Sequence, residues 1–150
     1  MERSVALRRD SKKLMNEEQR QLLQAAEKAA ESAYAPYSGF RVGAAVLTGG
    51  GVYSGANIET ASTNLGTCAE RVAIAHARMH GEVSIEGIAV CCPDAKPRAD
   101  GSMAESAAMP CGACRQWIAE LAPAAWLVTS SSDKVYHVQD LLPHAFQLKR

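Results

Sequence analysis

The sequence predicts an α/β protein, a three-layer α-β-α sandwich built on a five-stranded mixed sheet. Two observations support this prediction: segments with the pattern of strands alternate with segments rich in helix formers, and no internal repeat is visible. At 150 residues, 47% of them hydrophobic, the chain has the size of one domain with a substantial core. We expect a flexible N-terminal arm at residues 1–15 and a single domain at residues 16–150.

Local patterns predict the elements in order along the chain. A capping-box sequence at Asn16 and Gln19, followed by apolar residues at helical spacing, indicates a first helix at about 17–34. The three glycines at 49–51 indicate a turn between two antiparallel strands. Apolar runs bounded by glycine and proline give the remaining elements. The expected strands are 42–47, 52–58, 85–92, 124–129 and 135–138, and the other expected helices are 68–79 and 111–121.

A long irregular segment, residues 93–109, separates a predicted strand from a predicted helix. It contains two prolines and many small or polar residues, and it lacks the periodicity of a helix or a strand. Because loops of compact domains are usually shorter, we expect this segment to be either functional or disordered.

Composition and charge restrict the classes of function. Sixteen basic and sixteen acidic residues balance, so there is no basic excess of the kind that binds a nucleic acid polymer. No apolar run is long enough to cross a membrane, and residues 1–13 lack the apolar stretch of a secretory signal. Five cysteines, an odd number, favour a reducing compartment and metal or catalytic use over disulfides. We therefore expect a cytoplasmic protein that binds neither membranes nor nucleic acid polymers.

Two short segments offer ligands for a metal ion. They are Cys-Ala-Glu at 68–70 and Pro-Cys-Gly-Ala-Cys at 110–114, with thiols at Cys68, Cys111 and Cys114. A structural zinc site is closed by four protein ligands, whereas a catalytic site has three and leaves one position to water. Three thiolates with one nearby carboxylate fit a catalytic site. The pattern C-x-E followed by P-C-x-x-C is also the known signature of the zinc-dependent nucleobase deaminases, and this chain matches it.

The spacing of the motif places the metal at helix N-termini. Cys111 and Cys114 are three apart and share one helix face. Cys68 and Glu70 are two apart, so they converge only at a helix end. Three thiolates exceed the charge of Zn²⁺, and we expect the positive ends of two helices and the guanidinium of Arg71 to offset the excess. Glu70 would be the catalytic residue, moving protons between a metal-activated water and the substrate.

Cys91 and Cys92 leave one alternative open. They follow an apolar run, where a small buried thiol packs as a minor hydrophobic residue. If one of them instead completes a four-sulfur site, the protein is a zinc-stabilised binding module in which Glu70 has no catalytic role.

Over nearly its whole length, the chain resembles the homotetrameric zinc-dependent cytidine deaminases. The resemblance lies in six segments in the same order, which makes it much more specific than the metal motif alone. The segments are Tyr-Ala-Pro-Tyr-Ser-Gly-Phe at 34–40, Val-Gly-Ala-Ala at 42–45, Asn-Ile-Glu at 57–59, Cys-Ala-Glu-Arg at 68–71, Pro-Cys-Gly-Ala-Cys-Arg-Gln at 110–116, and Asp-Leu-Leu-Pro at 140–143 with Phe146.

The resemblance implies how a substrate would be bound. Asn57 and Glu59 would hold the ribose hydroxyls, and Phe40 would pack on the nucleoside. The backbone N–H of Ala69 would bind the pyrimidine carbonyl, and Phe146 would enter the pocket of a neighbouring subunit. The resemblance also implies one Zn²⁺ per subunit and a homotetramer whose active sites are shared between subunits.

Two departures from the family pattern bear on substrate range. Family members usually have Tyr or Phe where this chain has Thr63, and the segment 93–109 is longer than the corresponding connection. The expected reaction is the hydrolytic deamination of cytidine and deoxycytidine to uridine and deoxyuridine with release of ammonia, a step of pyrimidine salvage. The alternative is the same chemistry on a bulkier aminopyrimidine nucleoside, such as an N4-substituted cytidine or a nucleoside antibiotic.

Overall fold

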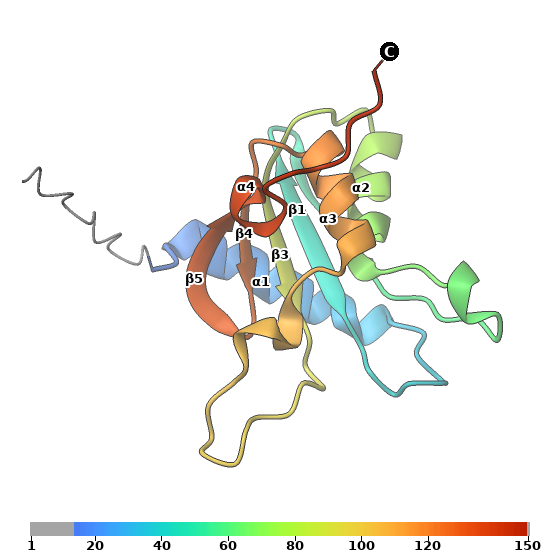
Figure 1. The fold of residues 1–150 in the computed structure, drawn as a ribbon, viewed down its shortest axis with the longest axis vertical. Coiled ribbons are helices and arrows are strands. Elements are labelled where there is room, and N and C mark those ends of the chain that lie inside the picture. Colours follow the sequence, from blue (N-terminus) through green and yellow to red (C-terminus); the bar gives the residue numbers. More distant parts are fainter. Residues whose placement is uncertain (1–13, 150) are drawn as a thin grey trace, which may run out of the picture.

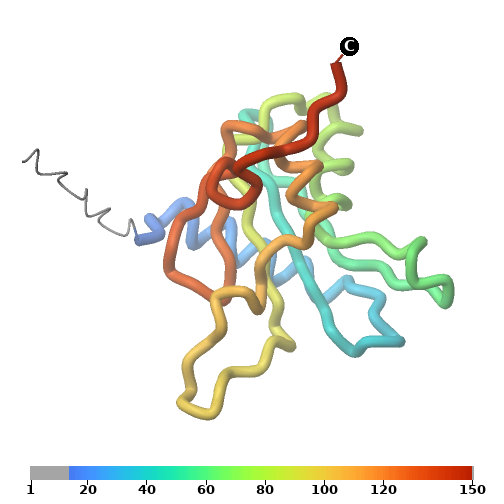
Figure 2. Tube along the Cα trace, in the orientation of Figure 1, coloured from blue at the N-terminus to red at the C-terminus, as the bar shows by residue number. Residues whose placement is uncertain are grey.

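The structure, a computed structural model, describes residues 14–149 and contains one five-stranded sheet. The strands are β1 (Gly43–Thr48), β2 (Gly51–Ala56), β3 (Ile85–Cys91), β4 (Trp126–Thr129) and β5 (Ser132–His137). Their order across the sheet is β2-β1-β3-β4-β5. Figure 2 shows the path of the chain that connects them. β3 and β4 are parallel, and the other neighbours are antiparallel. The expected mixed sheet is therefore confirmed.

Helices cover both faces of this sheet. The α-helices are α1 (Glu17–Ala29), α2 (Ala69–Met79), α3 (Gly112–Leu121) and α4 (Val138–Leu141), and the 3-10 helices are η1 (Ala30–Ser32), η2 (Thr63–Leu65) and η3 (Glu105–Ala108). α1 lies behind the sheet in Figure 1, and α2 and α3 lie in front of it. Each face has its own hydrophobic cluster, one around α1 and one beneath α2 and α3. These are the three layers that the sequence predicts.

Strand directions explain why α2 and α3 begin at the same edge of the sheet. β2 and β3 are both antiparallel to β1, so they run in the same direction. α2 follows β2, and α3 follows β3, so each helix starts beyond the carboxyl end of its strand. Such an edge is a common place for binding sites in α/β proteins.

Two glycines let helices approach the strands closely. A Cβ atom at Gly43 would lie 1.9 Å from the carbonyl oxygen of Ala26 in α1. A Cβ atom at Gly55 would lie 2.4 Å from the backbone nitrogen of Ala73 in α2. Only glycine fits such contacts without displacing the helix, and Gly55 thereby seats the first turns of α2 against β2.

Some boundaries differ from those expected. The first helix is regular only to Ala29 and continues as η1 to Ser32, while Tyr34 forms a bridge with Ile58. This bridge lies outside the sheet ladder, so the second strand ends at Ala56 and not at 58. The fifth strand starts earlier than expected, at 132. α4 has no counterpart among the expected helices, because four residues are too few to show helical periodicity.

The arm expected at 1–15 lies largely outside the described residues. Its last two residues contact β5: Leu14 forms a bridge with Lys134, and the backbone N–H of Met15 donates to the carbonyl of Asp133 at 3.3 Å. Across residues 14–149, none of the helices combines the length and the apolar character needed to cross a bilayer.

Candidate metal centre and adjoining cavity

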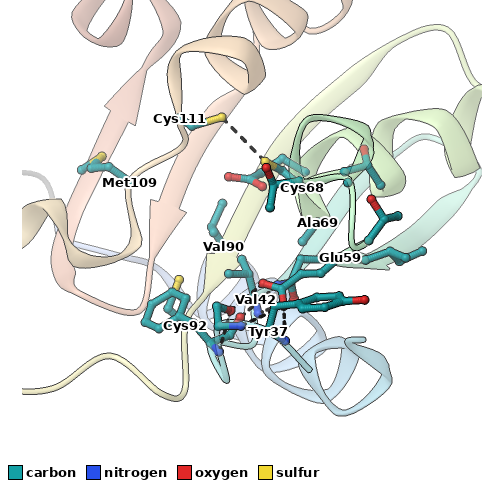
Figure 3. A pocket seen from close by; sticks show the side chains of 18 of the residues that line it. Tyr37, Val42, Glu59, Cys68, Ala69, Val90, Cys92, Met109 and Cys111 are labelled. Carbon is teal, nitrogen blue, oxygen red and sulfur yellow. Dashed lines mark hydrogen bonds between the residues drawn. The ribbon is translucent and has the colours of Figure 1, made fainter. Parts of the chain in front are cut away.

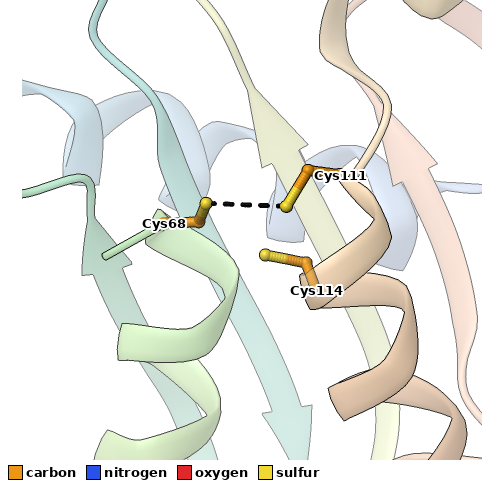
Figure 4. Close-up of side chains that lie close together, drawn as sticks. All are labelled: Cys68, Cys111 and Cys114. Atoms are coloured by element: carbon orange, nitrogen blue, oxygen red, sulfur yellow. Dashed lines mark hydrogen bonds between the residues drawn. The ribbon is translucent and has the colours of Figure 1, made fainter. Parts of the chain in front are cut away.

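Three cysteine thiols lie together where the N-termini of α2 and α3 meet (Figure 4). Cys68 is the N-cap of α2, Cys111 is the N-cap of α3, and Cys114 lies in the first turn of α3. Their sulfur atoms lie within 4.8 Å of one another, and those of Cys68 and Cys111 are 3.7 Å apart. Two sulfurs bound tetrahedrally to one zinc ion, each at about 2.3 Å, would be about 3.8 Å apart. The three residues therefore fit one zinc ion.

Cys91 and Cys92 lie outside this cluster. Both are buried, and burial raises the pKa of the Cys92 thiol to about 12. Within residues 14–149, the group of side chains able to hold a metal contains Cys68, Cys111 and Cys114 alone. The four-sulfur structural site that the sequence leaves open is therefore not formed. Three protein ligands are the donor set of a catalytic zinc site.

Hydrogen bonds and positive charge act on the thiol of Cys68. Hydrogen bonding with Cys114, together with Arg71, lowers the pKa of Cys68 to about 5. Arg71 Nη2 donates to the sulfur at 3.4 Å, and its buried Nε has no hydrogen-bond partner among the described residues. The N-termini of α2 and α3 add the positive ends of two helix dipoles, each equivalent to about half a charge. These groups offset the negative charge of three thiolates.

Glu70 lies in the first turn of α2, next to the metal centre. Its side chain is only 4% exposed and lines the adjoining cavity. Burial raises its pKa, and the negative charge of Cys68 adds to the effect. A carboxyl group whose pKa is raised holds a proton more readily than a free carboxyl group does, which suits a group that must both accept and donate protons.

A cavity of about 530 Å³ opens beside the metal centre (Figure 3). Residues from the segments 37–42 and 57–70, from β3 and from the segment 93–109 line it. Four of the residues expected to contact substrate are among them: Phe40, Asn57, Glu59 and Ala69. The fold thus brings an aromatic ring, an amide and a carboxylate to the same cavity as the thiols of Cys68 and Cys111.

Asn57 also holds part of the cavity wall in place. Its Oδ1 accepts a hydrogen bond from the backbone N–H of Val42 at 2.8 Å, and its Nδ2 donates to the carbonyl of Phe40 at 2.9 Å. The side chain therefore fixes the segment 37–42 while facing the cavity. Sequence reasoning misses this role, because no local pattern shows that these segments lie side by side.

Glu59 supports the same segment through its carboxylate. Oε1 accepts hydrogen bonds from the backbone N–H groups of Tyr37 and Ser38 at 3.0 and 3.1 Å, and Oε2 accepts one from the hydroxyl of Ser38 at 2.5 Å. The hydroxyl of Ser38 contributes most to lowering the pKa of Glu59. The carboxylate is therefore held ionised and in a fixed orientation at the cavity.

Phe146 does not line the cavity of its own chain. Its side chain is 72% exposed, and its backbone carbonyl accepts a hydrogen bond from Gln116 Nε2 at 3.0 Å. Insertion into a neighbouring subunit remains a prediction. The cavity wall also contains Thr63, which bears on substrate range, and Ala107 and Met109, which the sequence does not single out as site residues. The unusual length of the segment 93–109 is the available signal for the last two.

Known proteins are similar to this chain in sequence and in fold. Residues 16–130 match the family model for the cytidine and deoxycytidylate deaminase zinc-binding region. A cytidine deaminase of Halalkalibacterium halodurans is 43% identical over 130 residues, which cover 83% of this chain and 91% of that protein. The crystal structure of cytidine deaminase from Burkholderia pseudomallei has a TM-score of 0.71 at 40% identity, covering 88% of this chain and 100% of that chain. For the crystal structure of the Mycobacterium tuberculosis cytidine deaminase, the TM-score is 0.70 at 34% identity, with 86% of this chain and 97% of that chain covered. The family model spans well over half of the sequence, so the chain belongs to the cytidine and deoxycytidylate deaminase family.

Proposed function

We propose that this protein is a zinc-dependent enzyme of pyrimidine salvage, which hydrolyses cytidine and deoxycytidine to uridine and deoxyuridine with release of ammonia. One observation carries the proposal: Cys68 and Cys111 line the same cavity as Glu70, Asn57 and Glu59. A zinc site with three protein ligands, a buried acid–base group and two polar groups for a sugar are thus within reach of one small molecule. The cytidine deaminases similar to this chain support the same conclusion.

The reaction replaces the amino group at C4 of the pyrimidine with oxygen from water. Zinc, when held by Cys68, Cys111 and Cys114, supplies a nucleophile by lowering the pKa of a water molecule. Glu70 would take one proton from the attacking water and give it to ring N3. It would then take the second proton from the new hydroxyl at C4 and give it to the amino group, which leaves as the C4 carbonyl forms. The C4–N bond breaks as ammonia leaves, so each turnover consumes one water molecule and releases one ammonia molecule.

The remaining site residues orient the nucleoside. Asn57 and Glu59 retain donor and acceptor capacity after holding the segment 37–42, which they can offer to the ribose hydroxyls. The backbone N–H of Ala69 lies in the first turn of α2, where such groups lack partners within the helix, and it binds the pyrimidine carbonyl. The ring of Phe40 packs on the nucleoside. This division of roles places C4 at the metal centre.

Substitution of Glu70 tests the mechanism. Glu70→Gln should keep stoichiometric zinc and lose nearly all turnover, because the amide cannot exchange protons and a positioned acid–base group contributes on the order of 10²–10⁴-fold. An ultraviolet assay with cytidine and metal analysis of the same sample give the two measurements. Glu86→Gln, at an exposed position of β3, is the control. Retention of more than about a tenth of the wild-type kcat would remove Glu70 from the mechanism.

The substrate is a free nucleoside, and the enzyme acts in the cytoplasm. Equal numbers of acidic and basic residues leave no net attraction for a nucleic acid polymer. The three metal-binding thiols must stay reduced, which a reducing compartment ensures.

A homotetramer with shared active sites is part of this proposal. The exposed ring of Phe146 supports it, because a large apolar side chain on a terminal segment is suited to entering a partner's pocket. Sedimentation should show a tetramer. Phe146→Ala should raise KM clearly while changing the melting temperature little. A monomeric wild type with unchanged kinetics in Phe146→Ala would contradict the shared site.

A bulkier aminopyrimidine nucleoside is the second candidate substrate, and Thr63 is the observation that favours it. Thr63 lines the cavity at a position where the resemblance leads one to expect an aromatic ring. Thr63→Tyr should therefore depress turnover of an N4-enlarged cytidine while leaving cytidine turnover near the wild-type value. Equal effects on both substrates would argue against a widened pocket.

A further inference from the structure

The segment 93–109, called the long loop below, forms a part of the cavity wall that the proposed function does not use. Its first end is anchored through Asp94. The carboxylate of Asp94 accepts hydrogen bonds from the backbone N–H and Nε of Arg41, both at 2.9 Å, and from Nη2 of Arg41 at 2.8 Å. Arg41 lies between two cavity residues, Phe40 and Val42, so this ion pair joins the long loop to the wall formed by the segment 37–42.

The second end of the long loop is anchored through Glu105. Its carboxylate contacts Lys134 Nζ at 3.0 Å and accepts a hydrogen bond from the hydroxyl of Tyr136, both on β5. The buried hydroxyl of Ser131 donates to the carbonyl of Glu105 at 2.8 Å and accepts from the N–H of Ala108 at 3.2 Å. Ala108 itself belongs to the hydrophobic core. The end of the loop is therefore fixed to the body of the protein on both sides of residue 107.

Two apolar side chains of this anchored end line the cavity, those of Ala107 and Met109. Both are half-buried, whereas Ala108 between them is buried in the hydrophobic core. In Figure 3, Met109 lies on the side of the cavity away from Ala69 and Glu59. The long loop thus contributes an apolar wall opposite the polar groups.

The chemistry of the cavity orients the pyrimidine ring relative to this wall. C4 lies at the metal centre and Glu70, and N1, which is opposite C4 in the ring, carries the sugar. Of the two remaining edges, O2 and N3 accept hydrogen bonds, whereas C5 and C6 are apolar. The N-terminus of α2 offers backbone N–H groups and Glu70 delivers a proton to N3, so the accepting edge faces α2. The C5–C6 edge then faces the opposite wall.

We propose that Ala107 and Met109 are specificity-determining residues that set which C5 substituents a cytidine can carry, and that the two anchors of the long loop hold them in place. The inference rests on the proposed deamination. The small side chain of Ala107 leaves room for a methyl group, and the flexible thioether of Met109 can adapt to a larger apolar atom. The enzyme accordingly accepts cytidines with small apolar groups at C5.

The test compares kcat/KM for C5-substituted cytidines with that for cytidine itself. Ala107→Leu should lower the ratio of 5-methylcytidine to cytidine by about tenfold or more, because a misplaced methylene group is worth on that order in discrimination. Met109→Ala should raise the ratio of 5-iodocytidine to cytidine. Met103→Ala is the matched control, since Met103 belongs to the long loop but does not line the cavity, and it should leave both ratios unchanged.

Glu105→Ala tests the anchor separately. Loss of its carboxylate should shift the 5-iodocytidine ratio towards that of Met109→Ala while zinc content stays stoichiometric, and an unchanged ratio would remove the anchor from the proposal. If both Ala107→Leu and Met109→Ala leave the ratios unchanged while cytidine is still deaminated, Ala107 and Met109 do not determine which C5 substituents are accepted. If Ala107→Leu does not fold, Met109→Ala decides. A wild-type protein that binds zinc but leaves cytidine intact would instead refute the proposed function.

Discussion

Glu70, the proposed catalytic residue, lies where burial disfavours its ionised form. Burial raises its pKa above the ordinary value of 4.5, so the folded state binds the proton more tightly than the unfolded state does. Below pH 4.5 the group is protonated in both states and costs nothing. As the pH rises, the unfolded state ionises first, and the free energy of unfolding falls until the folded pKa is passed.

Removal of this charge should therefore stabilise the protein in a pH-dependent way. We expect Glu70→Gln to raise the melting temperature of the zinc-free protein at about pH 8 and to give a smaller rise at about pH 5. Thermal denaturation at the two pH values measures the effect, with Glu86→Gln as an exposed control. The same rise at both pH values would show that burial of the charge is not its cause.

At the scale of elements, the close packing of α2 against β2 determines where Cys68 lies. Gly55→Ala should cost about 1–3 kcal/mol through overpacking and should also weaken zinc binding, because the added Cβ pushes on the first turns of α2. Gly43→Ala pushes on α1, on the other face of the sheet, and should destabilise the fold without a comparable loss of zinc affinity. Denaturant unfolding and chelator competition give the two readouts. Gly112→Ala, where a Cβ meets nothing within 4 Å, serves as the tolerated control.

Arg115 connects the start of α3 with the C-terminal segment. Its Nε donates to the carbonyl of Pro110 at 2.9 Å, and its Nη1 donates to the carbonyl of Leu141 at 2.8 Å. Because Pro110 precedes the ligand Cys111, we expect Arg115→Met to lower zinc affinity about 10–100-fold, as loss of groups that orient metal ligands commonly does. Competition with a chromophoric chelator measures this. Gln116→Met loses only the bond to residue 146 and should bind zinc normally.

The elements show which parts of the structure can be predicted from sequence. The ligands at 68, 111 and 114 and the helices that carry them are predictable, since their spacing and caps are local. The pattern of the second strand extends too far, to residue 58, because the bridge at Ile58 belongs to a tertiary pairing with Tyr34. The pairing of Arg41 with Asp94 spans 53 positions, and no local pattern records it.

At the scale of the whole molecule, the metal joins two helices that start from different strands. The three thiols that would bind the metal come from both helices, so the metal connects α2 to α3. Without the metal this connection is lost, and the contact between the two helices should weaken. Removal of zinc with a chelator should therefore lower the melting temperature and increase amide hydrogen exchange in the first turns of α2 and α3. α1, on the opposite face, is the internal control. Uniform exchange across all three helices would indicate global unfolding instead.

The outer turn of the long loop offers a position for engineering. Residues 96–102 are exposed, and the turn closes through a hydrogen bond from the N–H of Arg98 to the carbonyl of Ser102 at 2.8 Å, with Gly101 at φ +83°. The contacts of Asp94 and Glu105 tie down the chain on either side. A fluorescent reporter inserted in this turn would remain outside the catalytic machinery, since exposed loop tips tolerate insertion. Because these contacts separate the turn from the cavity wall, a reporter there should leave the selectivity for C5-substituted cytidines unchanged.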